Sequence, residues 1–140
     1  MTDYTQLLAE AMKARENSYC PYSGFAVGAA LLTTDGAVYR GCNVENSSYG
    51  ATNCAERTAL FAAVADGRRR GDFVAIAIAG GPKDGELISC PPCGICRQAL
   101  SEFADAAEFK VLWATGEDVE YEEHTLAELL PLGFEMYINP

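Results

Sequence analysis

One short apolar run constrains the fold of this chain more than any other stretch. Residues 73–79 read Phe-Val-Ala-Ile-Ala-Ile-Ala and include no charged residue, glycine or proline. Their β-branched content favours a strand, and because apolar residues do not alternate with polar ones, we expect both faces of that strand to be buried. The run therefore predicts an inner strand of a layered α/β protein.

Helical and strand-like patterns flank this run. We expect helices over residues 4–15, 56–65, 96–103 and 125–130, and strands over residues 25–32, 37–42, 109–114 and 118–122, the last at an edge of the sheet. The turn residues Thr34-Asp35-Gly36 join the first two strands in an antiparallel hairpin, and residues 80–85 are expected to form a loop. Because the later strands alternate with helices, part of the sheet should be parallel.

The charge of the chain restricts its partners. The chain has 140 residues, of which 49% are hydrophobic, and a net charge of −10 with only ten Lys plus Arg. That length fits one globular domain over residues 1–140. So few basic residues argue against a nucleic-acid partner, because Lys and Arg make most phosphate contacts. The one basic cluster, Arg68-Arg69-Arg70, is expected to be a solvated turn, and a small neutral substrate fits the charge better.

The sequence predicts neither export nor membrane insertion. The stretch from Met1 to Gln6 lacks the basic start of a signal peptide, and no apolar stretch is long enough to span a bilayer. We therefore expect no membrane partner and a cytoplasmic location. In that compartment six cysteines are more often reduced or metal-bound than paired as disulfides.

Three thiols and one carboxylate stand at the starts of two expected helices. They belong to Cys54-Ala55-Glu56-Arg57 and Pro92-Cys93-Gly94-Ile95-Cys96. Thr52 or Asn53 is the expected N-cap of the first helix, so Cys54 should lie in its first turn. The free N–H groups and the helix dipole there favour a thiolate, which is the form that ligates metal. Cys93 likewise stands at the start of an expected helix, directly after two prolines.

This donor set predicts a catalytic zinc site. A structural zinc site closes all four positions with protein ligands, whereas a catalytic site supplies three and leaves the fourth to water. Cys54, Cys93 and Cys96 would supply those three ligands. Glu56 is then free to act as the general base toward water activated at the metal.

Three thiolates give the zinc site a net negative charge of about −1, which weakens the metal as a Lewis acid. Positive groups should compensate for that charge. Arg57 and Arg97 each follow the base or a ligand directly, and we expect both to hydrogen-bond the sulfurs.

Two other interpretations use the same cysteines. Cys90 stands three residues before Cys93 and could complete a closed, four-thiolate structural site, which would leave Glu56 without a role. Alternatively, the CxxC pattern from Cys93 to Cys96 is also used in thiol redox proteins. The redox interpretation leaves Cys54-Ala55-Glu56 unexplained.

Three stretches together resemble the small, zinc-dependent, homotetrameric cytidine deaminases. They are Asn43-Val44-Glu45-Asn46-Ser47-Ser48-Tyr49-Gly50, Cys54-Ala55-Glu56-Arg57 and Pro92-Cys93-Gly94-Ile95-Cys96-Arg97-Gln98. The resemblance extends from Tyr22 to Phe134. It implies a three-layer α/β/α sandwich around a five-stranded mixed sheet, one Zn²⁺ per chain, and a homotetramer with active sites near the subunit interfaces.

The resemblance also implies a reaction and a set of substrate contacts. The reaction is hydrolytic deamination of cytidine and 2′-deoxycytidine, as in pyrimidine salvage, with Glu56 moving the protons. The contacts it implies are Asn43 and Glu45 to the ribose, the Ala55 N–H to the base carbonyl, and Phe25, Tyr49 and Phe134 around the substrate. Alternation along the chain independently points Asn43 and Glu45 to one side. A carboxylate there disfavours a phosphorylated substrate.

One alternative lies inside the same superfamily. Blasticidin-type aminonucleoside deaminases share the Cys-Ala-Glu and Pro-Cys-Gly-x-Cys elements, although the run Asn43-Val44-Glu45-Asn46 favours cytidine. Pro91 departs from the Ser or Thr expected two residues before Cys93. If that position acts through its carbonyl on the exocyclic amine, proline still supplies it.

Overall fold

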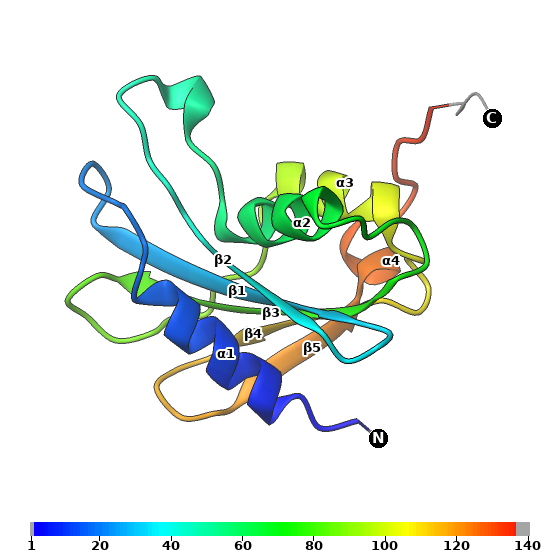
Figure 1. The fold of residues 1–140 in the computed structure, drawn as a ribbon. Helices are drawn as coiled ribbons and strands as arrows, with labels where there is room; N and C mark the ends of the chain where they lie inside the picture. The colour runs from blue at the N-terminus through cyan, green and yellow to red at the C-terminus, as the bar shows by residue number, and fades with distance from the viewer. Residues whose placement is uncertain (1, 137–140) are drawn as a thin grey trace.

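The computed structural model describes residues 2–136, which form ten helical and strand elements (Figure 1). The strands are β1 (Phe25–Thr33), β2 (Val38–Cys42), β3 (Phe73–Pro82), β4 (Lys110–Ala114) and β5 (Tyr121–Thr125). The helices are α1 (Thr5–Arg15), α2 (Ala55–Ala65), α3 (Gly94–Phe103), α4 (Leu126–Leu129) and the 3₁₀ turn η1 (Tyr49–Ala51).

The five strands form one mixed sheet in the order β2-β1-β3-β4-β5. Only β3 and β4 pair in parallel; the pairs β1 with β2, β1 with β3, and β4 with β5 are antiparallel. The parallel pair requires a crossover, and α3 lies within it. The sequence prediction of a partly parallel sheet behind an opening hairpin is therefore confirmed.

Helices cover both faces of the sheet, with α1 on one face and α2, α3 and α4 on the other (Figure 1). Strand β3 separates two apolar clusters. Ile76 and Ile78 face α2 and α3, whereas Ala75, Ala77 and Ala79 face α1. The run at 73–79 is thus a strand buried on both faces, as predicted, within a three-layer α/β/α sandwich.

Two strand boundaries differ from those that the sequence predicts. Residues 80–85 were expected to be loop, but β3 continues to Pro82 because Gly80 and Gly81 pair with Val27 and Ala26 of β1. The edge strand begins at Tyr121 rather than 118. Thr115 N–H donates to the Glu120 carbonyl at 3.2 Å, so the preceding residues close the turn into β5.

Two glycines let helices approach the sheet closely. A Cβ on Gly28 would lie 2.1 Å from the Ala11 carbonyl oxygen of α1, and one on Gly41 would lie 2.4 Å from the Ala55 carbonyl oxygen of α2. Any larger residue would overlap helix backbone, which cannot turn away as a side chain can. Gly41 therefore fixes the distance between β2 and the first turn of α2.

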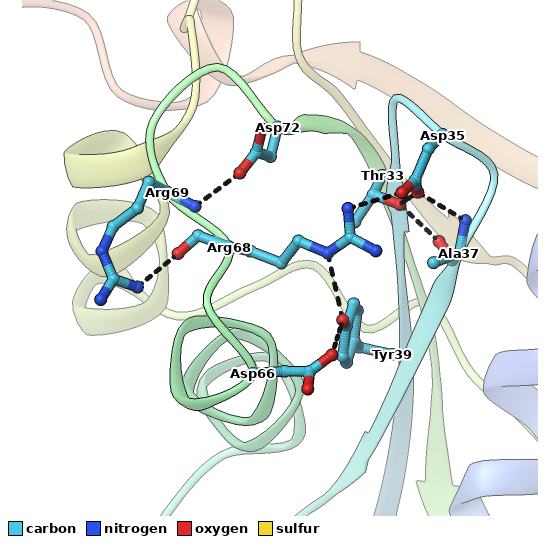
Figure 2. A network of polar contacts seen from close by, with 8 residues as sticks. All are labelled: Thr33, Asp35, Ala37, Tyr39, Asp66, Arg68, Arg69 and Asp72. Carbon is cyan, nitrogen blue, oxygen red and sulfur yellow. Dashed lines mark hydrogen bonds and ion pairs between the residues drawn. The ribbon is translucent and has the colours of Figure 1, made fainter.

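The arginine triplet is only partly the solvated turn that was expected. Arg69 and Arg70 are exposed, but Arg68 extends over the Tyr39 ring and donates to Asp35 Oδ2 at 2.8 Å and to Tyr39 Oη at 3.1 Å (Figure 2). Tyr39 in turn donates to Asp66, the residue that ends α2. This network ties the β1–β2 turn to the C-terminal end of α2.

Among residues 2–136, the helices are all too short or too polar to cross a membrane.

Candidate active site

The first ligand candidate stands at the start of α2. The helix begins at Ala55, and Cys54 itself is the N-cap residue, with extended backbone angles. The sequence predicts Thr52 or Asn53 in that role, and this prediction is wrong. Asn53 cannot start the helix because its N–H and carbonyl both pair with Val44, which keeps its backbone extended.

The other two ligand candidates stand at the start of α3. Cys93 is the N-cap, and the helix runs from Gly94, two residues earlier than the sequence suggested. Cys96 lies in the first turn and is buried. Both helices therefore bring their N-terminal ends, where free N–H groups favour anionic sulfur, to the same place.

The three sulfurs form a group that fits zinc. The Sγ atoms of Cys54, Cys93 and Cys96 all lie within 4.8 Å of one another, and those of Cys54 and Cys93 are 3.8 Å apart. Tetrahedral zinc with bonds of about 2.3 Å places two thiolates about 3.8 Å apart. Within the part of the chain that the structure describes, Cys90 does not belong to this group, so the closed four-thiolate site is not formed.

Of the two arginines expected beside the sulfurs, one lies there. Arg57 Nη2 donates to Cys54 Sγ at 3.2 Å, and its buried Nε has no hydrogen-bond partner among residues 2–136. Arg97 points elsewhere: its guanidinium donates to the carbonyls of Pro92 at 2.8 Å and Leu129 at 2.9 Å. The expectation for Arg97 was wrong because the last turn of α4 offers it an unpaired carbonyl.

The protonation states of the site differ from those of free side chains. Hydrogen bonding with Cys96, then with Arg57 and Cys93, lowers the pKa of Cys54 despite its burial. Glu56, 5% exposed in the first turn of α2, has its pKa raised to about 7, chiefly by desolvation and also by the nearby charge of Cys54. A carboxyl group with a pKa near neutrality can both accept and give a proton.

Cys54, Glu56 and Cys93 line a cavity of about 280 Å³. Its walls come from β1, the segment after β2, the start of α2 and the segment before α3. The lining residues are Ser23, Phe25, Val27, Asn43, Glu45, Thr52, Asn53, Cys54, Ala55, Glu56, Cys90, Pro91 and Cys93. The cavity therefore joins a candidate metal site, a buried carboxyl group and several polar side chains.

Comparison with known proteins decides the family. Residues 1–112 match the family described as the cytidine and deoxycytidylate deaminase zinc-binding region. The chain belongs to this deaminase family. It is 51% identical over 132 residues to the cytidine deaminase of Halalkalibacterium halodurans, an alignment that covers 94% of this chain and 94% of that relative. It is 48% identical to the cytidine deaminase of Sporosarcina psychrophila, over 94% of this chain and 91% of that relative.

Solved structures agree with the deaminase assignment. The crystal structure of cytidine deaminase from Burkholderia pseudomallei aligns with a TM-score of 0.84 and 46% identity over 96% of this chain and 100% of that chain. The Mycobacterium tuberculosis enzyme aligns with a TM-score of 0.76 and 38% identity, covering 97% and 100%. The family resemblance and the fold inferred from the sequence are confirmed, and zinc is the cofactor that the three-cysteine group suits.

Four of the deaminase's expected substrate residues line the cavity: Phe25, Asn43, Glu45 and Ala55. Asn43 Oδ1 accepts from Val27 N–H at 2.9 Å, and its Nδ2 donates to the Phe25 carbonyl at 2.8 Å. These bonds fix the amide against β1.

Glu45 is held by the turn before β1. Its Oε1 accepts from the N–H groups of Tyr22 at 2.9 Å and Ser23 at 3.1 Å, and its Oε2 from the Ser23 hydroxyl. These bonds, the Ser23 hydroxyl first, lower the pKa of Glu45. The carboxylate is therefore charged at neutral pH and fixed at the rim of the cavity.

The other two expected substrate residues of the deaminase lie outside this cavity. Tyr49 is 84% exposed and lines a neighbouring hollow with Tyr22 and Asn46. Phe134 is 68% exposed, and its carbonyl accepts from Gln98 Nε2 of α3 at 2.8 Å. Neither side chain contributes to the cavity of its own chain.

Sequence reasoning missed several cavity residues of the deaminase, namely Ser23, Val27, Thr52 and Asn53. Ser23 could have been noticed as a polar residue before Gly24, whose φ of 67° marks a tight turn. Val27 carries no such feature, because its place at the cavity follows only from the pairing of β1.

Proposed function

We propose that this chain catalyses the hydrolytic deamination of cytidine and 2′-deoxycytidine to uridine and 2′-deoxyuridine, with release of ammonia. One observation carries the proposal: a buried carboxyl group, Glu56, and two members of the three-sulfur group line a cavity that an amide and a carboxylate also line. The similarity to curated cytidine deaminases over 94% of the chain supports it.

Glu56 carries the proton transfers. Cys54, Cys93 and Cys96 would hold the zinc, which would supply a Lewis acid that lowers the pKa of water. Glu56 takes a proton from that water and delivers it to N3 of the base as oxygen attacks C4. It then takes the proton of the new C4 hydroxyl group and gives it to the exocyclic nitrogen, so that the C4 carbonyl forms as the C4–N bond breaks and ammonia leaves. Arg57, hydrogen-bonded to Cys54, offsets part of the negative charge of the thiolates.

The cavity rim selects a nucleoside. In this proposal Asn43 and Glu45 hold the ribose hydroxyls, the Ala55 N–H meets the base carbonyl and Phe25 contacts the ring. The charge on Glu45 repels a substrate phosphate, and the net charge of −10 adds to that repulsion. Nucleoside monophosphates and polynucleotides should therefore be poor substrates.

The exposed aromatic residues support an assembly. We propose a homotetramer in which Tyr49 and Phe134 reach the active site of a neighbouring copy. Large apolar side chains cluster near Phe134, including Leu132, fully exposed, and Met136, 71% exposed. Exposed apolar side chains that form one contiguous patch mark an interaction surface.

We also propose that residues 1–140 act as a single deaminase domain in cytoplasmic pyrimidine salvage. All six cysteines lie outside disulfides, which suits a reducing compartment.

The test is the ultraviolet absorbance of cytidine mixed with purified protein of known zinc content. Loss of the cytidine band with about one zinc per chain is expected. The same assay with cytidine monophosphate and with blasticidin S ranks the three substrates. Faster loss of blasticidin S than of cytidine would assign the chain to the aminonucleoside deaminases. The variant Glu56→Ala should keep zinc and lose turnover; substantial residual activity would remove Glu56 from the proton transfers.

A further inference from the structure

The segment 89–92 forms one wall of the active-site cavity. It is part of the connection between β3 and α3, and two of its residues, Cys90 and Pro91, line the same cavity as the start of α2. The next residue, Cys93, is a member of the sulfur group. A displacement of this segment would therefore change the width of the cavity.

The backbone holds this segment weakly. The last backbone bond before it is from Ile88 N–H to the Gly80 carbonyl, at 2.9 Å, and the next after it lies at the start of α3. Pro91 and Pro92 have no N–H to donate. Among the described residues 2–136, two side chains bond the segment: Arg97 Nε to the Pro92 carbonyl and Trp113 Nε1 to Ser89 Oγ, at 2.8 and 3.1 Å.

Trp113 is a rigid support. It lies on β4, is 5% exposed, and packs in the apolar cluster beneath α2 and α3. The His124 ring stacks on it, with ring centres 5.3 Å apart and planes at 15°. A stacked and buried indole has few other rotamers, so its N–H is aimed at one place.

We propose that Trp113 is a positioning residue for the deaminase reaction, acting through its hydrogen bond to Ser89, which holds the Cys90–Pro91 wall at the width that fits the base. The proposal rests on the function proposed above. Trp113 does not line the cavity, so its effect on the substrate passes through the wall. Cys54 and Glu56 lie at the start of α2, outside the wall, and Arg97 still bonds the Pro92 carbonyl beside Cys93, so we expect substrate binding to suffer more than the chemical step.

The experiment compares Ser89→Ala, Trp113→Phe and the double variant with wild type, all zinc-loaded. Each single variant should raise the KM for cytidine about fivefold, the factor that corresponds to one hydrogen bond of about 1 kcal/mol. The kcat should stay within about twofold and the zinc content unchanged. Because both changes remove the same bond, the double variant should be no worse than the more impaired single variant.

Two further measurements separate positioning from general damage. Trp113 is the single tryptophan of the chain, so its emission maximum should shift in Ser89→Ala as the indole loses its partner. The matched control is Ser101→Ala, which removes a hydroxyl that bonds the Gln98 carbonyl within α3, and its KM should equal that of wild type.

Either of two results would overturn the positioning role: unchanged KM in both single variants, or a double variant whose loss is the product of the two single losses. In both cases active wild-type enzyme leaves the proposed function intact. If wild-type protein does not deaminate cytidine at all, the proposed function fails, and the role of Trp113 fails with it.

Discussion

Replacing Gly41, which does not line the cavity, by alanine should damage the active site through its contact with α2. The added Cβ would lie 2.4 Å from both the Ala55 carbonyl oxygen and the Ala59 nitrogen, whereas ordinary contacts begin at 3.4 Å. Both atoms are helix backbone. The start of α2 must therefore move by about 1 Å, and this is the part of the helix that carries Glu56 and Cys54.

The close contact at Gly41 predicts the size of a loss in stability and of a loss in activity. Overpacking of this kind costs about 1–3 kcal/mol of unfolding free energy, which lowers the Tm by roughly 4–12 °C in a chain of this length. A misplacement of about 1 Å at the reacting groups costs about 100-fold in kcat/KM. The assays are thermal denaturation and cytidine turnover at measured zinc content.

Gly116→Ala is the matched control. It makes the same chemical change at a glycine with open space around the new Cβ and without a positive φ. Its stability and activity should equal those of wild type. If Gly41→Ala behaves like this control, the close approach of β2 to α2 does not position the site.

Three further variants probe charge. Arg57→Gln removes the hydrogen bond to Cys54 and should weaken zinc binding about 10–100-fold, as measured by competition with a chelator. Glu128, then Glu122, raises the pKa of His124 above 6.5, so His124 should stabilise the fold below pH 6.5 and cease to do so as pH rises through its raised value. The Tm difference between wild type and His124→Gln should follow that course; a constant difference would contradict it. Arg68→Ala removes the ion pair with Asp35 and should lower the Tm, by less in 1 M salt than in dilute buffer.

Local spacing was enough to predict the three-sulfur group. Cys93 and Cys96 are one helical turn apart at the start of α3, and Cys54 and Glu56 lie together at the start of α2. The start of each helix therefore places its own pair of residues. Continuous apolar character likewise identified β3. These features depend on residues close together in the sequence.

The predictions that failed depended on contacts distant in sequence. Cys54 replaces Asn53 as the N-cap because Asn53 pairs with Val44, and Arg97 turns from the sulfurs because Leu129 lies near. The support of Ser89 by Trp113 spans 24 positions and has no local pattern. Pairing register and helix packing decide such contacts, and neither can be read from propensity or periodicity.

Strand β3 imposes different limits on substitution at its two faces. On the side of α1 it presents Ala75, Ala77 and Ala79, where even one added methyl group would push a whole helix outward. On the side of the catalytic helices it presents Ile76 and Ile78, whose bulk can be exchanged for other branched side chains of similar volume. We therefore expect fewer tolerated substitutions on the face of β3 toward α1, which lies away from the active site, than on the face toward α2 and α3.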